Sequence, residues 1–267
     1  MKDYRAFIEN LLKEASAVAM HNFGKVSGVI KPGDNNQVLT ETDIEIGNLI
    51  VNRVKVEYPD HNIIDEEAGV IDRRSAYTWV VDPIDGTSNF ASGIPMFGIM
   101  IGLLEDGTPI AGGIALPAFG EIYSAAKGQG ATCNGEKVFV TKEEQLLNSL
   151  AAYGIDGHQE NPVVTRDETA LLGDIILGVR NLRSSNSVFD QAMVAKGKYG
   201  TALNRTSKIW DNVAQHIVVV EAGGIYTDFF GEPMDYSDPV SKTDANFTMC
   251  AAAPVLHGQL MQIIHAR

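Results

Sequence analysis

The hydrophobic pattern changes character near Thr141, and this change limits the folds that the chain can adopt. Before it, two helical patterns precede a run of short apolar strands; beyond it, short strands alternate with helical patterns. Segregated elements are typical of α+β folds, and alternation is typical of α/β folds. We therefore predict two differently built halves, with the boundary between Val140 and Leu147. In the second half, strands are expected at 149–153, 175–179, 225–228 and 248–252, and helices at about 161–172, 187–197, 211–222 and 254–265.

The first half begins with two expected helices. Apolar residues recur at three- and four-residue spacing from Tyr4 to Ala19, which indicates an amphipathic helix. Turn-forming residues at 31–36 then predict a loop. Thr42 followed by Glu45 is typical of a capping box, so a second helix is expected from there to about residue 57. Strands are expected at 62–64, 78–81, 98–104, 110–116 and 121–126, with Asp106-Gly107 turning a hairpin between the third and the fourth.

Composition excludes several classes of function. The 34 acidic residues outnumber the 21 Lys and Arg, and the formal net charge of −13 argues against a nucleic-acid or anionic-membrane partner. Cys133 and Cys250 stand far apart with no CxxC, which is neither a disulfide framework nor a zinc cluster. Charges interrupt the N-terminal apolar residues, so we expect no signal peptide or membrane helix and a cytoplasmic protein.

The segment Asp82-Pro83-Ile84-Asp85-Gly86-Thr87 is the sharpest functional signal. A strand delivers Asp82 to its end, and a tight turn can bring Asp85 and the Ile84 carbonyl beside it. Two anions about 4 Å apart repel by about 4 kcal/mol at an effective dielectric constant of about 20, unless a cation lies between them. Mg²⁺ prefers carboxylate, carbonyl and water oxygens, so a magnesium site is one interpretation. Gly86 and Thr87 could also open a helix whose free amides face an anion.

Each acidic segment also has a structural interpretation. Pro-x-Asp-Gly is a common turn, and Asp65-Glu66-Glu67 after a strand could be a solvated loop. Trp210-Asp211 opens an apolar helix that ends near Gly223-Gly224, and Asp is a favoured helix N-cap. No G-x-S-x-G, P-loop or dinucleotide motif is present.

Taken together, these segments resemble the inositol monophosphatase family. The matching pieces are Glu66-Glu67, the run from Trp79 to Phe90, and Trp210-Asp211 with the helix end at 221–224. The resemblance implies a layered α-β-α-β-α fold: an antiparallel sheet with two long helices in residues 1–142, and an α/β half with a mixed sheet in residues 143–267. It also implies Mg²⁺-dependent hydrolysis of small phosphate monoesters, a homodimer, and the lithium inhibition found in some members.

The same resemblance implies roles for individual residues. Glu66, Asp82 and the Ile84 carbonyl would hold a first Mg²⁺, and Asp82, Asp85 and Asp211 a second. Glu66 would also help a third ion through water. Thr87 and Asp43 match the pair that orients the attacking water, and the amides of Gly86 and Thr87 match the phosphate cradle. The implied substrate contacts are Asp85, Gly86, Thr87, Arg183, Ser187, Asn204, Lys208 and Asp211.

Some positions depart from the family pattern. Gln37 stands where an Asp is frequent, which leaves the count at two or three Mg²⁺. The segment from Arg183 to Phe189 is usually built of smaller residues in the family, and the bulkier Val188 and Phe189 could reshape the pocket or fill the core. Asn204 replaces a Glu that contacts a sugar hydroxyl, and Lys208 replaces a His. A Lys there would favour a bisphosphate, or it could be a surface residue.

The sequence therefore predicts an α+β phosphomonoesterase that acts on myo-inositol monophosphate or a similar phosphorylated polyol or sugar. Metal ions suit this reaction, because the loose transition state of a phosphate monoester needs charge stabilisation more than covalent help. Fructose 1,6-bisphosphate, 3′-phosphoadenosine 5′-phosphate and histidinol phosphate are alternative substrates. A regulatory binding protein that keeps the fold but acts through a partner is the alternative from another class.

Overall fold

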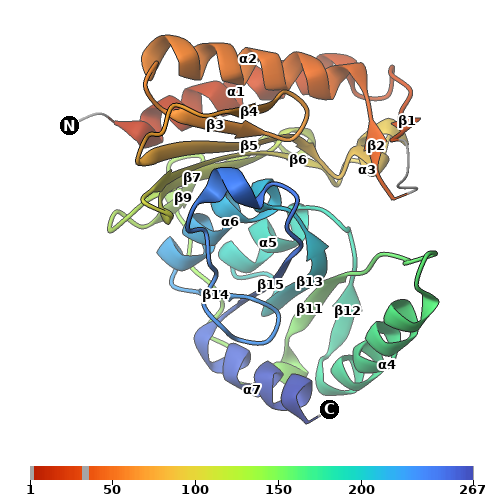
Figure 1. Cartoon of the computed structure of the whole chain (residues 1–267). Coiled ribbons are helices and arrows are strands. Elements are labelled where there is room, and N and C mark those ends of the chain that lie inside the picture. Colours follow the sequence, from red (N-terminus) through yellow and green to blue (C-terminus); the bar gives the residue numbers. More distant parts are fainter. Residues whose placement is uncertain (1–2, 32–35, 267) are drawn as a thin grey trace.

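Two antiparallel helices form the outermost layer of the first half (Figure 1): α1 (Tyr4–Asn22) and α2 (Glu41–Glu57). The computed structural model describes residues 3–31 and 36–266, so most of the loop predicted at 31–36 lies outside the described residues. Both predicted helices are confirmed, but the capping box at Thr42 and Glu45 is wrong by two residues. Thr40 is the N-cap and Asp43 is the third helical residue, because the Asp43 carboxylate accepts the Thr40 backbone N–H at 2.9 Å.

An eight-stranded sheet packs beneath these helices in the order β10-β9-β8-β7-β6-β5-β3-β4. Its neighbours pair antiparallel except β3 with β5, which run parallel. The predicted strands and the hairpin at Asp106-Gly107 are confirmed, and the strand around residue 80 is longer than predicted. The bounds are β3 (Asn62–Asp65), β4 (Gly69–Ile71), β5 (Tyr77–Asp85), β6 (Gly98–Glu105), β7 (Thr108–Leu116), β8 (Glu121–Ala126), β9 (Ala131–Cys133) and β10 (Glu136–Lys137), with a separate pair β1 (Val29–Ile30) and β2 (Val38–Leu39) and a short helix α3 (Thr87–Ala91).

The second half holds a mixed five-stranded sheet in the order β12-β11-β13-β15-β14. Its strands are β11 (Leu150–Gly154), β12 (Asn181–Arg183), β13 (Thr201–Ser207), β14 (Ile225–Thr227) and β15 (Phe247–Ala252). Its helices are α4 (Pro162–Gly178), α5 (Phe189–Ala195), α6 (Ile209–Glu221) and α7 (Pro254–His265). The boundary predicted between residues 140 and 147 falls in the stretch between β10 and β11 and stays a prediction.

One second-half prediction is wrong, and one strand of the second sheet was not predicted. The strand expected at 175–179 is the last turn of α4, and the strand forms later as β12. The run Ile175-Ile176-Leu177 looks like a buried strand, yet only Ile175 is buried while Leu177 is 80% exposed, as expected on a helix with one packed face. Strand β13 was not predicted, because its sequence TALNRTS has no apolar run.

The layers alternate as helix pair, sheet, helix pair, sheet, helix pair, which confirms the expected α-β-α-β-α order (Figure 1). Helices α5 and α6 form the central layer, and α4 and α7 cover the far face of the second sheet. Helix α6 lies directly on the β6–β7 hairpin, because Gly102 and Gly112 pair across it and present no side chain. A Cβ at Gly102 would lie 2.6 Å from Val213 Cγ1 and 2.9 Å from the Ala214 backbone N. This close approach places the start of α6 over the end of β5.

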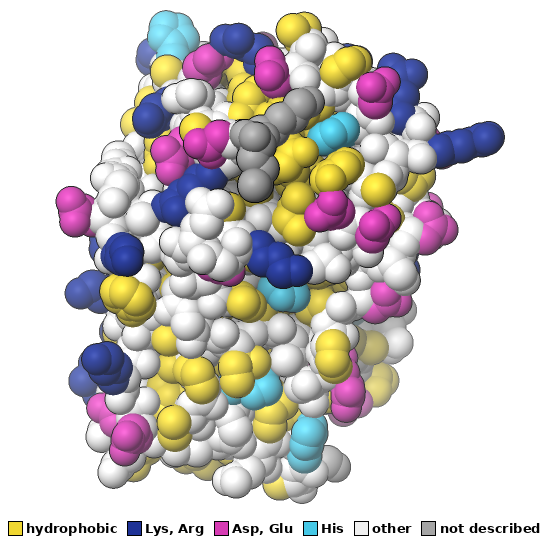
Figure 2. All heavy atoms as spheres, turned by 90° about the vertical axis from the view of Figure 1, so that its left-hand side faces the viewer, with side chains coloured by type: hydrophobic (Ala, Val, Ile, Leu, Met, Phe, Trp, Pro, Cys, Tyr) yellow, Lys and Arg dark blue, Asp and Glu magenta, His cyan; other side chains and the backbone are white. Residues whose placement is uncertain are grey.

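The surface charges, the two cysteines and the helix lengths complete the description of the fold. Figure 2 shows the molecule from the left-hand side of Figure 1, and on this face basic and acidic side chains are interspersed among apolar ones. Cys133 is half-buried and Cys250 is buried, and both are free thiols. Across residues 3–31 and 36–266, no helix is both long and apolar enough to cross a membrane.

Candidate active site

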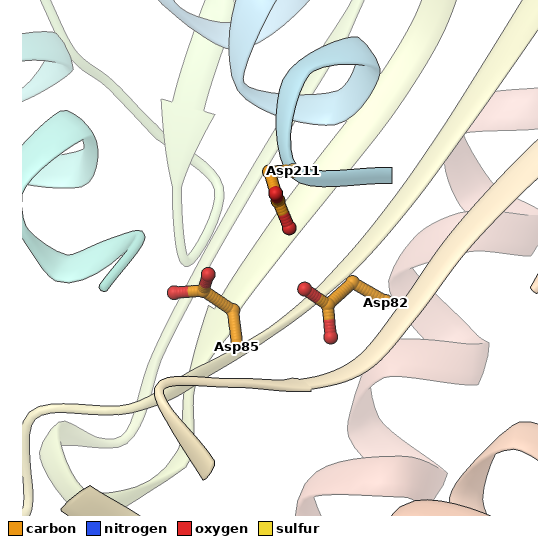
Figure 3. A group of neighbouring side chains, drawn as sticks. All are labelled: Asp82, Asp85 and Asp211. Atoms are coloured by element: carbon orange, nitrogen blue, oxygen red, sulfur yellow. The ribbon is translucent and has the colours of Figure 1, made fainter. Parts of the chain in front are cut away.

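Three carboxylates converge where the two halves meet. Asp82 and Asp85 come from the end of β5, and Asp211 comes from the first turn of α6 (Figure 3). One oxygen of each lies within 4.8 Å of the other two. The β5–β6 register shifts between Asp82 and Asp85, so the strand is irregular where the turn predicted at Pro83 begins. The segments that the sequence separates by more than 120 residues therefore build one acidic cluster.

Burial and mutual repulsion disfavour ionisation of this cluster. Burial, and then the neighbouring carboxylates Glu66 and Asp211 respectively, raise the pKa of Asp82 and of Asp85 well above the usual range. Burial also raises the pKa of Asp211 to about 6. The Oδ1 atom of Asp82 is buried and has no hydrogen-bond partner among the described residues. Buried oxygens that lack a donor and repel one another fit a hard divalent cation, which supplies the missing positive charge.

Backbone amides fix the orientation of two of these carboxylates. The Val188 backbone N–H donates to Asp85 Oδ2, and the Lys208 backbone N–H donates to Asp211 Oδ2 at 2.6 Å. Lys208 is therefore the N-cap of α6 and Asp211 its third residue, rather than the N-cap that the sequence allowed. Because one oxygen of Asp211 is held by its own helix end, the other is free to face Asp82 and Asp85.

Glu66 lies beside this cluster at the end of β3 and lines the same pocket. The Lys31 ammonium contacts Glu66 Oε1 at 2.8 Å and Glu67 Oε1 at 2.6 Å. Burial, then the Asp211 carboxylate, raise the pKa of Glu66 to about 7 although Lys31 lowers it. Burial lowers the pKa of Lys31, but its two carboxylate partners outweigh this and raise it above the usual range. The sequence does not predict this role of Lys31, because nothing in a turn-rich loop indicates which residue one Lys will contact.

Thr87 and Asp43 lie together next to the end of β5. The Thr87 hydroxyl is 3.2 Å from Asp43 Oδ1 and 2.8 Å from the Ile84 carbonyl oxygen. Asp43 is 1% exposed, and its other oxygen is held by Thr40 in the capping box of α2. Burial raises the pKa of Asp43, which hydrogen bonds from Thr40 and Thr87 partly offset.

The pocket around these groups has a volume of about 700 Å³. Most of the expected substrate contacts line it, namely Asp85, Gly86, Thr87, Ser187, Asn204, Lys208 and Asp211. Gln37 and Ile84 line it as well. Arg183 does not, because it lies on the edge strand β12 and its guanidinium donates to the neighbouring Leu182 carbonyl at 2.8 Å.

Gly86 occupies the tightest point of the pocket wall. Its φ is +80°, and a Cβ there would lie 2.8 Å from Ser187 Cβ and 3.2 Å from the Met96 carbonyl oxygen. Only glycine therefore fits at the start of α3, whose first amides have no partner inside the helix.

Asn89 joins the two halves at this wall and was not singled out from the sequence. Its amide nitrogen donates to the Met96 carbonyl at 2.7 Å and to the Ser185 carbonyl at 2.8 Å. The hydrogen bond to Ser185 holds the segment that carries Ser187 against α3. The only sequence signal was its place within the motif that ends at Phe90.

The layered fold and the buried carboxylate cluster are the arrangement that the resemblance to a family of phosphomonoesterases implied. The chain belongs to the inositol monophosphatase family, whose model matches residues 1–266.

Its relatives agree with this assignment. The chain is 32% identical over 234 residues to a fructose-1,6-bisphosphatase/inositol-1-monophosphatase of Aquifex aeolicus, covering 85% of this chain and 86% of the relative. It is 28% identical over 231 residues to human inositol monophosphatase 1, covering 84% and 83%. Among solved structures, a Thermotoga maritima IMPase superposes with a TM-score of 0.86 at 27% identity, covering 99% of this chain and 98% of that one.

Proposed function

We propose that this chain hydrolyses myo-inositol monophosphate, or a similar polyol monophosphate, in a reaction that requires Mg²⁺. The convergence of Asp82, Asp85 and Asp211 is the observation that carries the proposal. The site would take two Mg²⁺: Glu66, Asp82 and the Ile84 carbonyl would hold the first, and the three aspartates the second. A third ion near Glu66 is less favoured, because Gln37 offers no charge there and Lys31 already contacts Glu66.

Bound Mg²⁺ supplies charge stabilisation for the phosphoryl oxygens and lowers the pKa of bound water. The protein's own part in the proton transfer falls to Thr87 and Asp43. Thr87 has one hydroxyl proton, which it donates to Asp43 or to the Ile84 carbonyl, and its lone pairs remain free to accept from water. An attacking water that donates to Thr87 would therefore be oriented by a hydroxyl that Asp43 in turn holds.

The charge of the pocket supports a monophosphate over a bisphosphate. Among the described residues that line it, Lys208 is the one Lys or Arg, and its ammonium donates to the Asp244 carbonyl at 2.8 Å. A second phosphate would thus meet a single cation that already has a partner. Fructose 1,6-bisphosphate is the second candidate, because the Aquifex relative is named for both substrates.

The test is phosphate release with millimolar Mg²⁺ and with EDTA. The substrates are inositol 1-phosphate, fructose 1,6-bisphosphate, 3′-phosphoadenosine 5′-phosphate and histidinol phosphate. We expect Mg²⁺-dependent release led by inositol 1-phosphate. Preference for a doubly phosphorylated substrate would indicate that Lys208 binds the second phosphate. No phosphate release from any of the four substrates would favour the alternative of a regulatory binding protein. A homodimer and a cytoplasmic location remain part of the proposal, and gel filtration with light scattering tests the dimer.

A further inference from the structure

Asp65 is a buried acid next to Glu66 that the proposed reaction does not use. It is the last residue of β3, it is 2% exposed, and it pairs with Gly69 across a three-residue hairpin loop. Its Oδ1 atom accepts the backbone N–H of Glu67 at 3.0 Å and of Ala68 at 2.6 Å. The side chain of Asp65 therefore closes the loop that contains Glu66 and Glu67.

The loop is held from its other side by the sheet. The Glu66 backbone N–H donates to the Val81 carbonyl at 3.3 Å, which continues the parallel pairing of β3 with β5. Glu66 lines the pocket, whereas Asp65 packs toward α2. The backbone of Glu66 is thus fixed by Val81 before it and by the Asp65 carboxylate after it.

Helix α2 leaves space for this carboxylate at Gly47. A Cβ at Gly47 would lie 3.1 Å from both Asp65 oxygens and 3.3 Å from Pro83 Cγ. Glycine is unfavourable inside a helix, so its presence at this contact is explained by the close approach of Asp65 and Pro83. The Oδ2 atom of Asp65 has no hydrogen-bond partner among the described residues, so its contribution is the loop closure made by Oδ1.

We propose that Asp65 is a positioning residue for metal binding: its hydrogen bonds to the Glu66–Ala68 loop hold Glu66 in the orientation that the proposed Mg²⁺ site needs. The inference rests on the proposed function, since Glu66 matters there only if it binds a metal. Without this closure Glu66 would have to be ordered when the metal binds, and the affinity for Mg²⁺ would fall by the free energy of that ordering.

Two variants separate loop closure from charge. Asp65→Asn keeps the Oδ1 acceptor and removes the charge, whereas Asp65→Ala removes both. Mg²⁺ affinity of the metal-free protein is measured by titration calorimetry, and half-saturating Mg²⁺ is measured in the phosphate-release assay. We expect Asp65→Ala to lower the Mg²⁺ affinity, and to raise the half-saturating Mg²⁺ concentration, by at least about fivefold. Its kcat at saturating Mg²⁺ should stay within about threefold of the wild-type value. Asp65→Asn should stay within about twofold.

A matched control lies in the second half. Asp228 Oδ1 accepts the backbone N–H of Phe230 at 2.9 Å and of Glu232 at 2.8 Å, which is the same kind of loop closure away from the pocket. Asp228→Ala should lower the melting temperature while leaving Mg²⁺ affinity unchanged. Gly47→Ala presses on the same contact, because its Cβ would lie 3.1 Å from both Asp65 oxygens and would have to push the carboxylate slightly away. It also presses on Pro83, so it is the second choice, used to test for weaker Mg²⁺ binding if Asp65→Ala fails to fold.

Failure of the Asp65 inference and failure of the proposed function give different results. Asp65→Ala or Gly47→Ala with unchanged Mg²⁺ affinity would overturn the inference, and so would Asp65→Asn that binds as weakly as Asp65→Ala. Wild-type protein that shows neither Mg²⁺ binding nor Mg²⁺-dependent turnover would instead contradict the proposed function itself.

Discussion

The Thr87 hydroxyl contacts the buried Asp43 carboxylate and the Ile84 carbonyl of the proposed metal site, so variants that remove or keep this hydroxyl test the proton path. Its contacts to Asp43 Oδ1 and to the Ile84 carbonyl depend on the hydroxyl group and not on the methyl group of Thr87. Thr87→Ala should lower kcat by about 100-fold, the usual contribution of a positioned proton acceptor, with Mg²⁺ affinity unchanged. Thr87→Ser keeps the hydroxyl and should retain most of the rate. Equal losses in both variants would mean that packing, rather than the hydroxyl, matters.

The raised pKa values predict how the metal-free protein responds to pH. Burial raises the pKa of Asp65 and of Asp211 to about 6 and that of Glu66 to about 7, against ordinary values of 3.8 and 4.5. Between about pH 4 and pH 7 the folded state therefore binds more protons than the unfolded state, and stability falls as pH rises through this window.

Thermal melts across this window measure the effect. In EDTA, the melting temperature should rise as the pH is lowered from 8 to about 5.5. With saturating Mg²⁺ the added stability should be largest at pH 8, because the metal binds ionised carboxylates. A melting temperature in EDTA that climbs with pH over the same range would contradict the raised pKa values of these carboxylates, which have to outweigh the opposite effect of the buried His216 and His257.

The sequence predicts which residues form the site better than it predicts which residues contact each other there. Asp82, Asp85 and Asp211 stand in recognisable local patterns, and the fold brings all three together. The contact of Lys31 with Glu66 spans 35 residues of sequence, and nothing local to either residue predicts it. Such pairs depend on how a loop crosses the sheet, which a linear pattern does not encode.

At the scale of elements, the position of α6 on the β6–β7 hairpin decides whether the site can form. Gly102 and Gly112 let the helix backbone approach, and this approach carries Asp211 to the end of β5. A methyl group at Gly102 would collide with Val213 and with the Ala214 backbone. Gly102→Ala should therefore cost about 1–3 kcal/mol of stability, the usual penalty for overpacking.

The same variant should lose activity, because α6 must shift to relieve the collision. Gly173→Ala in α4 is the control: a Cβ there meets nothing within 4 Å, and alanine favours a helix interior by about 1 kcal/mol. Denaturant unfolding and Mg²⁺-dependent turnover are measured for both. Full activity in Gly102→Ala would refute the claim that this contact places Asp211.

Elements with strong periodicity or turn chemistry were predictable, and elements set by packing were not. The hairpin at Asp106-Gly107 and helix α1 follow from local sequence alone. The end of α4 did not, since Ile175 to Leu177 is compatible with strand or helix until its neighbours are known. The mixed polar sequence of β13 becomes a strand because β11 and β15 supply hydrogen bonds on both sides.

At the scale of the whole molecule, the two halves share a buried hydrophobic cluster. Met100, Ile114 and Tyr123 of the first sheet pack in one buried cluster with Val188 and Ile217 of the second half. Neither half could expose this cluster to water without a large cost in apolar burial. Calorimetry should show one unfolding transition, with calorimetric and van't Hoff enthalpies in agreement. Two separated transitions would mean that residues 1–142 and 143–267 fold independently.

We propose that the converging aspartates hold the Mg²⁺ that the reaction requires. The most direct measurement is Mg²⁺-titrated phosphate release from inositol 1-phosphate by wild-type protein and Asp82→Asn, with melting in EDTA for both. We expect wild-type turnover that EDTA abolishes, and a loss of at least about 100-fold in Asp82→Asn. The melting temperature of Asp82→Asn should be equal or higher, because carboxylate repulsion falls. Full turnover by Asp82→Asn, or wild-type turnover that persists in EDTA, would contradict the account.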